Sequence, residues 1–213
     1  MENDLHGPRE GPPWLIQTGS RPVLFSAVHG VVHERPGLGI KSAEARTGGL
    51  ARVLAASLDT SVAVVLRGIG EPDANFDPQH PLKLALLEQQ LVGPHMAVID
   101  LHGMTDHHAA DVAIGWGPNL QLAEAVAALA VTAFADNGFR VDPNGAESGL
   151  YGAGEGTITT FAQRHGSSAI QVEIARRNRT FRSGAERRIR LLRSFCRLVD
   201  DIEQKLPGLH GTD

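Results

Sequence analysis

Runs of apolar residues alternate with amphipathic segments along most of this chain, and this alternation predicts its secondary structure. Short runs such as Val23–Val28 and Ser61–Leu66 are apolar at successive positions, as in strands buried on both faces of a sheet. Longer segments with apolar residues three or four apart predict helices. We expect strands at Leu15–Gln17, Val23–Val28, Ser61–Leu66, Met96–Leu101, Asp111–Trp116 and Ala169–Ile174, and helices near Ala43–Leu58, Pro81–Leu91, Leu120–Asn137, Thr157–His165 and Gly184–Lys205.

Strands that alternate with helices indicate an α/β fold with a mixed, mostly parallel central sheet flanked by helices. The chain shows neither an internal repeat nor an interdomain linker, so we expect one domain at residues 15–213. A Gly- and Pro-containing segment at residues 1–14 is expected to be flexible. Two further segments predict loops, Arg35–Ile40 and the glycine-rich Asp142–Gly156.

Composition narrows the class of protein. Hydrophobic residues make up 42% and charged residues 21%, which is an ordinary globular balance. A net charge of -4 gives no support for nucleic-acid binding. No apolar run approaches the roughly 20 residues that span a bilayer, and a single cysteine, Cys196, rules out an intrachain disulfide. We expect a cytoplasmic protein that binds neither membranes nor nucleic acids; the sequence does not indicate its oligomeric state.

The basic stretch Arg176–Arg193 is the one segment that favours a polyanionic partner. Its interleaved Ile189, Leu192 and Phe195 favour a different interpretation, an amphipathic helix with a buried apolar side and a solvated basic side.

Two histidine motifs stand at the ends of predicted strands. The first is His29-Gly30-Val31-Val32-His33-Glu34, and the second is Asp100-Leu101-His102-Gly103. Catalytic zinc takes three His or carboxylate ligands and keeps a position open for water. Ligand sites in open α/β sheets also lie at strand ends. The pattern therefore predicts a zinc site with His29, His102 and either Glu34 or His33.

Other polar residues near strand ends complete a candidate hydrolytic site. Glu173 lies within the apolar run Ala169–Ile174, where a carboxylate is costly to bury unless it is paired, so it is the candidate general base. Arg67 follows another strand, with Asp73 and Asn75 after it, and is a candidate for fixing an anionic substrate. Asp100 is a candidate partner of His102, on the expectation that the strand kinks between them.

These motifs, in this order, resemble the N-formylglutamate amidohydrolase family and the zinc carboxypeptidase-like fold behind it. The spacing from His29 to Glu34 is similar to that of the poly-γ-glutamate hydrolases of the same fold. The resemblance implies one Zn²⁺ per chain on His29, Glu34 and His102, with Glu173 as base. It also implies hydrolysis of an amide bond near a carboxylate. The quoted motifs are Ser26–Gly30, Arg67, Asp73-Ala74-Asn75, Asp100–Gly103 and Gln171–Ile174.

The chain departs from this family at one substrate-binding position. The family pattern Asp-x-Asn-Arg reads Asp73-Ala74-Asn75-Phe76 here, so its arginine is missing. We therefore expect Arg67 or Arg176 to meet the substrate carboxylate, together with Asn75. Tyr151, at the centre of the Asp142–Gly156 loop, is expected to close over the site.

The function that these patterns predict is a zinc-dependent amidohydrolase acting on an N-acyl amino acid, a γ-glutamyl compound or a peptide. Two alternatives stay open at this point. One is a metal-binding or regulatory homologue without catalysis, and the other is a binding module that uses the basic C-terminal helix and no metal.

Overall fold

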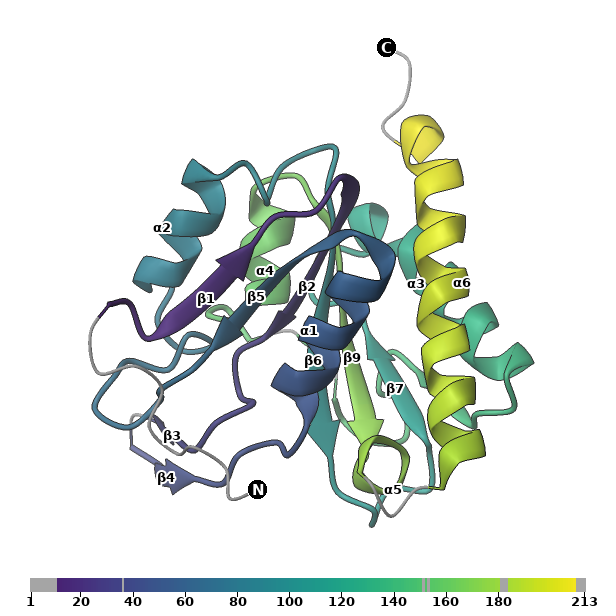
Figure 1. Ribbon diagram of the computed structural model, residues 1–213, viewed down its shortest axis with the longest axis horizontal. Coiled ribbons are helices and arrows are strands. Elements are labelled where there is room, and N and C mark those ends of the chain that lie inside the picture. Colours follow the sequence, from purple (N-terminus) through teal and green to yellow (C-terminus); the bar gives the residue numbers. More distant parts are fainter. Residues whose placement is uncertain (1–10, 36, 151, 153, 181–183, 210–213) are drawn as a thin grey trace.

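A single seven-stranded sheet organises the protein, with strand order β1-β5-β2-β6-β9-β7-β8 (Figure 1). The structure is a computed structural model, and it describes residues 11–35, 37–150, 152, 154–180 and 184–209. The four central strands β5, β2, β6 and β9 run parallel to one another. β1 pairs antiparallel with β5, and β7, with β8 beside it, pairs antiparallel with β9. This arrangement confirms the predicted mixed, mostly parallel sheet.

The sheet strands are β1 (Trp14–Gln17), β2 (Arg21–Ala27), β5 (Thr60–Val65), β6 (Ala97–Met104), β7 (Val112–Gly115), β8 (Val141–Pro143) and β9 (Ser168–Ala175). A separate hairpin consists of β3 (His33–Arg35) and β4 (Gly39–Lys41). The helices are α1 (Thr47–Leu58), α2 (Pro81–Glu88), α3 (Leu120–Asp136), α4 (Ile158–Arg164), α5 (Arg176–Arg179) and α6 (Ala185–Leu209).

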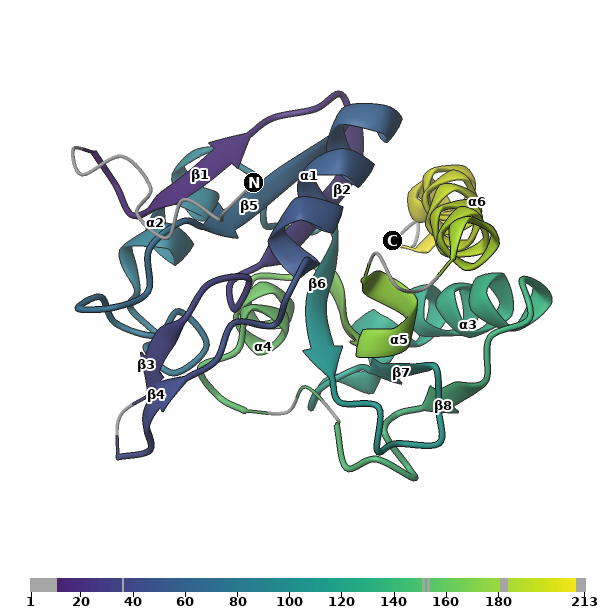
Figure 2. The same ribbon diagram turned by 60° about the horizontal axis from the view of Figure 1, so that its bottom comes forward.

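Helices cover both faces of the sheet (Figures 1 and 2). Residues of α1, α3 and α6 pack with the sheet in one apolar cluster that includes Phe25, Phe134 and Phe195. Residues of α2 and α4 form a second cluster with Leu24 and Val98. Because neighbouring positions on β2 belong to different clusters, the strand is buried on both faces, as its continuous apolar run predicts.

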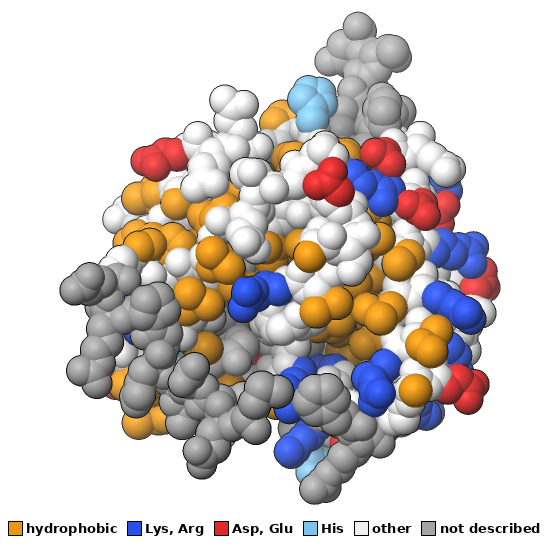
Figure 3. All heavy atoms as spheres, in the orientation of Figure 1, with side chains coloured by type: hydrophobic (Ala, Val, Ile, Leu, Met, Phe, Trp, Pro, Cys, Tyr) orange, Lys and Arg blue, Asp and Glu red, His pale blue; other side chains and the backbone are white. Residues whose placement is uncertain are grey.

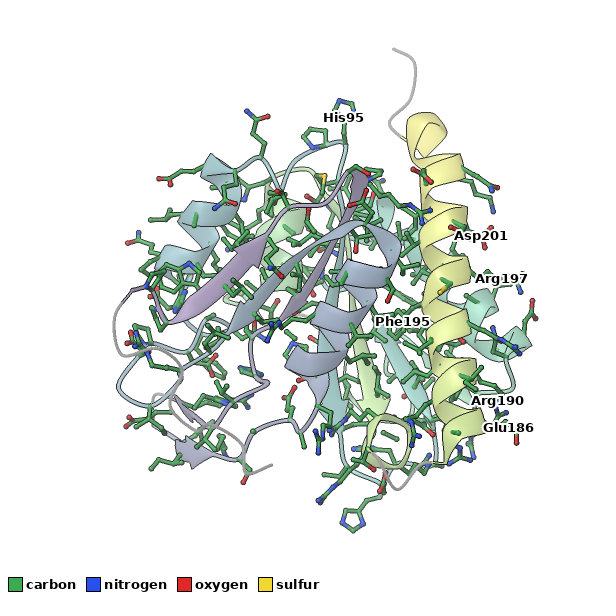
Figure 4. The ribbon with its side chains drawn as sticks, viewed as in Figure 1. His95, Glu186, Arg190, Phe195, Arg197 and Asp201 are labelled. Atoms are coloured by element: carbon green, nitrogen blue, oxygen red, sulfur yellow. The ribbon has the colours of Figure 1, made fainter. Side chains whose placement is uncertain are left out.

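Helix α6 separates its apolar and charged residues. Phe195 points from the helix toward the protein interior, whereas Arg197 lies on the outer side with Asp201 (Figure 4). Figure 3 shows acidic side chains interleaved with basic ones on the right-hand side of the molecule, where α6 lies in the same view. These features support the amphipathic interpretation of the segment. One detail of it is wrong, because Ile189 is 47% exposed rather than on the buried side.

The segment between β2 and α1 differs from the sequence expectation. Part of the predicted loop Arg35–Ile40 is the hairpin β3–β4, in which Glu34 pairs with Ile40. Helix α1 begins at Thr47 rather than near Ala43, because Arg46 has a φ of 77° that the right-handed helix does not allow. The short helix α5 and strand β8 were also not predicted. Among the described residues, no helix is both long and apolar enough to cross a membrane.

Candidate active site

The carboxyl ends of the central parallel strands bring the candidate residues to one edge of the sheet. His29 follows β2 by two residues, and His102 lies near the end of β6. Glu173 on β9 is in register with His102, so the two are neighbours across the sheet. Asp73 and Asn75 reach the same edge from the loop after β5. Parallel strands thus place residues far apart in sequence at a common ligand-binding edge.

His29 and His102 both turn one ring nitrogen toward the carboxylate of Glu44. Nδ1 of His29 lies 3.3 Å from Oε1 of Glu44, and Nδ1 of His102 lies 3.1 Å from Oε2. One candidate ligand atom from each residue lies within 4.8 Å of the others. Two imidazole nitrogens and a carboxylate are a donor set that zinc accepts, so these residues fit the metal that the motifs imply.

The outer nitrogens of both imidazoles contact buried carboxylates. Nε2 of His29 lies 2.8 Å from Oδ1 of Asp73, and Nε2 of His102 lies 3.1 Å from Oδ2 of Asp100. Ser26 donates a 2.6 Å hydrogen bond to the other oxygen of Asp100. Carboxylates in this position fix the ring orientation of metal-binding histidines and increase their basicity. The inner nitrogens are therefore oriented for a cation.

The Glu44 carboxylate is positioned by the backbone around it. The backbone amide of Glu44 donates to the carbonyl of His29 over 2.9 Å, and the backbone amide of Gly103 donates to Oε2 of Glu44 over 3.0 Å. Arg179 donates to the carbonyl of Ala45, the residue after Glu44. These contacts join the segment before α1 to the ends of β2 and β6, and they place Glu44 between the two imidazoles.

His33, Asp73 and His29 form a second group of metal-binding residue types. The rings of His29 and His33 stack 4.1 Å apart, and Nε2 of His33 lies 3.8 Å from Oδ2 of Asp73. Arg35 already contacts this carboxylate oxygen, with Nε at 3.3 Å. Asp73 thus already has Arg35 and Nε2 of His29 as partners, whereas Glu44 faces one nitrogen from each of two imidazoles, so the Glu44 group is the better metal site.

Opposite charges determine the protonation of this cluster. Burial lowers the pKa of both His29 and His102, but the neighbouring carboxylates outweigh it and raise both. Burial raises the pKa of Glu44, but the two histidines outweigh it and hold the pKa well below its usual range. Without metal, these shifts favour the protonated form of both imidazoles and the ionised form of Glu44. Metal binding must displace these protons.

Glu173 is a buried carboxyl group of the site whose pKa is raised. Its side chain is 6% exposed, and burial, joined by the charges of Glu44 and Asp100, raises its pKa to about 7 despite the nearby histidines. Gln171 donates a 2.7 Å hydrogen bond to its Oε1. A carboxylate with a pKa near neutrality suits a general base that later returns its proton.

A pocket of about 770 Å³ opens over these groups. It is lined by His29, Glu44, His102 and Glu173, and by residues of the glycine-rich segment after β8. The other lining residues are Arg35, Asn75, Phe76, Gly103, Met104, Thr105, His108, Gly149, Leu150, Gly152, Gly154, Glu155, Gly156, Thr157 and Gln171.

The structure corrects the placement of Glu34. This residue is exposed on β3 and belongs to neither group of metal-binding types, whereas Glu44 lies between the two histidines. The physical reason is the hairpin, because the pleat of β3 directs His33 inward and Glu34 outward. The proposed alternative, His33, is buried next to His29 but lies on the side of Asp73 rather than Glu44.

The structure also corrects the predicted substrate arginines. Arg67 donates to the carbonyl of Gly11 over 3.0 Å and does not line the pocket. Arg176 is exposed on α5, also outside the lining residues. Asn75 does line the pocket, where its Nδ2 lies 3.1 Å from Nε2 of His102. Tyr151 lies outside the described residues.

Sequence reasoning missed two charged residues of the pocket, Glu44 and Arg35. Both lie in the segment between β2 and α1, which lacks a clear periodic pattern. The sequence pattern places Glu44 in the first turn of the helix expected near Ala43–Leu58, where an acidic residue is common. The break at Arg46 that turns it toward the site depends on a backbone conformation with no glycine to signal it.

Comparisons with known proteins identify the class of fold. The chain resembles the N-formylglutamate amidohydrolase from Ralstonia eutropha over 90% of its length and 98% of that chain, with a TM-score of 0.65 and 12% identity. It resembles a bacteriophage poly-γ-glutamate hydrolase over 95% of its length and 93% of that chain (TM-score 0.59, 15% identity). A metallo-carboxypeptidase from Burkholderia cenocepacia matches 92% of this chain and 61% of its own (TM-score 0.50, 11% identity).

These likenesses confirm the zinc carboxypeptidase-like fold that the motifs predicted, and at these identities they show the fold alone. No protein-family model matches the sequence, and no curated protein matches it either.

Proposed function

We propose that this protein is a zinc-dependent amidohydrolase that cleaves an amide bond of a small or peptide substrate carrying a carboxylate. The observation that carries the proposal is the pair of imidazoles, each with one nitrogen at Glu44 and the other on a buried aspartate. Such an arrangement orients neutral histidine ligands toward one cation. On this proposal one Zn²⁺ per chain is held by His29, Glu44 and His102.

Held by these residues, the metal would supply a water of lowered pKa and would polarise the carbonyl of the scissile amide. Glu173 accepts the proton of the attacking water, because its pKa is raised to about 7 and it lines the same pocket. It then returns the proton to the leaving nitrogen. Gln171 keeps the Glu173 carboxylate in place by its hydrogen bond. Asp73 and Asp100 hold the imidazoles in position throughout.

The metal content of the purified protein tests the ligand set. We expect about one zinc per chain in the wild type by mass spectrometry, and loss of zinc in His102→Ala and Glu44→Gln. Glu34→Gln is the matched control, because Glu34 is exposed and outside the cluster. Zinc that survives in Glu44→Gln but is lost in Glu34→Gln would overturn the assignment in favour of the sequence-based one.

Hydrolysis of N-acyl amino acids and γ-glutamyl peptides by the zinc-loaded protein tests the reaction. Turnover that disappears with a chelator and returns with zinc is the expected result. A protein that binds zinc at the site without hydrolysing any of these compounds would favour the metal-binding homologue. A protein that takes up no zinc would favour the metal-free binding module.

A further inference from the structure

Arg35 is the one Arg or Lys among the described residues that line the pocket. It ends β3, and its side chain is 26% exposed. The guanidinium carbon lies 5.2 Å from the ring centroid of Phe76, so the ring forms a platform under the cation. The carboxylates of Glu44, Glu155 and Glu173 also line the pocket. Arg35 thus adds a permanent positive charge to this side of the pocket, where an anionic ligand group is favoured.

The contacts of the guanidinium place its terminal edge at the metal site. Nε donates to Oδ2 of Asp73 over 3.3 Å, which fixes the inner edge of the group. Nη2 lies 3.3 Å from Nδ1 of His29, the nitrogen that faces Glu44. Neither a protonated imidazole nor one bound to a metal offers an acceptor at this nitrogen, so Nη2 faces the metal site without an acceptor on His29. A carboxylate of a bound ligand beside the metal would accept from it in the two-pronged geometry that a guanidinium favours.

Other arginines near the site are used differently. Arg179 donates to the backbone carbonyls of Ala45, Ile174 and Met104, so its guanidinium joins the segment before α1 to the ends of β6 and β9. Arg67 and Arg176 do not line the pocket.

We propose that Arg35, stacked on Phe76 and oriented by Asp73, binds a carboxylate of the substrate beside the metal and makes the enzyme selective for anionic substrates. The planar fork of an arginine suits a carboxylate, and a lysine reproduces only its charge. The inference rests on the proposed function, because it concerns the same pocket, and it adds the residue that selects the substrate class. Phe76 occupies the position where the family pattern has an arginine. Here its ring stacks against the guanidinium of Arg35 instead of carrying a positive charge itself.

The test compares two probes that differ by one charge, succinate and its monoamide succinamate, by calorimetric titration of the zinc-loaded protein. Both carry one carboxylate for the metal, and only succinate has a second. A charge-assisted hydrogen bond contributes about 1.5–3 kcal/mol. We therefore expect the wild type to bind succinate at least about tenfold more tightly than succinamate. The ratio of the affinity for succinate to that for succinamate should fall to near one in Arg35→Gln and to an intermediate value in Arg35→Lys.

Arg52→Gln is the matched control, because Arg52 is exposed on α1 and does not line the pocket; it should keep the full preference. Phe76→Ala should reduce the preference while leaving the arginine in place, and it provides a second test if Arg35→Gln does not load zinc. The assignment would be overturned if the zinc-loaded Arg35→Gln variant showed the same preference for succinate as the control. It would also be overturned if the single variants Arg35→Lys and Phe76→Ala both kept that preference. Absence of zinc or of hydrolysis in the wild type would instead remove the proposed function.

Discussion

The carboxylate of Asp100 lies 3.1 Å from Nε2 of His102, two residues further along β6. Residues two apart on a strand point to the same face, so the contact needs no kink, contrary to our expectation from the sequence. Both side chains are buried, at 0% and 3% exposure. The strand therefore carries a metal-ligand candidate and its supporting acid as one rigid unit.

Replacing this acid should weaken zinc binding while the fold persists. We expect Asp100→Asn to reduce zinc affinity by about 10–100-fold, because supporting carboxylates contribute on this scale. Competition titration with a chromophoric chelator measures the change. Asp136→Asn, an exposed aspartate paired with Arg197, is the control and should bind zinc like the wild type. Equal affinities in the two variants would contradict the supporting role of Asp100.

Glu173→Gln should separate chemistry from metal binding. The amide keeps the size of the side chain but cannot accept the proton of the attacking water, so we expect turnover to fall by about 10²–10⁴-fold. Zinc content should stay near one per chain, because Glu173 is not in the His29, Glu44 and His102 group. Steady-state kinetics and metal analysis on the same preparation check both. Retained turnover would remove the base assignment.

The environment of Lys83 leads us to expect that the stability of the folded protein depends on pH. Its side chain is fully buried on α2, and Nζ donates to the carbonyls of Asp77 (2.7 Å) and Gly156. Burial lowers its pKa from 10.5 to about 8. Between these values the unfolded chain binds more protons than the folded one, so the lysine contributes increasing stability as pH rises.

Urea unfolding of the wild type and Lys83→Met at pH 7.5 and pH 10 measures this effect. We expect the difference in the free energy of unfolding to move in favour of the wild type by about 2 kcal/mol as pH rises. A difference that does not change with pH would show that Lys83 keeps its ordinary pKa in the folded protein.

The hairpin that carries Arg35 depends on Gly68. A Cβ at this position would lie 2.5 Å from the carbonyl oxygen of Val32 and 2.9 Å from Cβ of His33. We expect Gly68→Ala to displace the hairpin, lower stability by about 1–3 kcal/mol and reduce the preference for succinate over succinamate. Gly49→Ala is the control, since a Cβ there meets nothing within 4 Å. Unfolding and the probe titration check the two effects.

Local patterns in the sequence predicted most of the strands and helices of the fold. The apolar runs predicted the buried strands, and strands of one direction end at one edge of the sheet. This is why His29, His102 and Glu173 were expected together, and the structure places them around one pocket. Their roles as metal ligands and base stay predictions until the metal and the reaction are measured.

The tertiary structure decided which carboxylate and which arginine complete the site. Glu34 is nearer to His29 in sequence, but Glu44 is nearer in space because the β3–β4 hairpin lies between them and Arg46 bends the chain before α1. Arg35 likewise reaches the pocket only through this hairpin. Apolar periodicity reports burial within one strand or helix. The path of an irregular segment depends instead on contacts between residues distant in sequence, which no local pattern encodes.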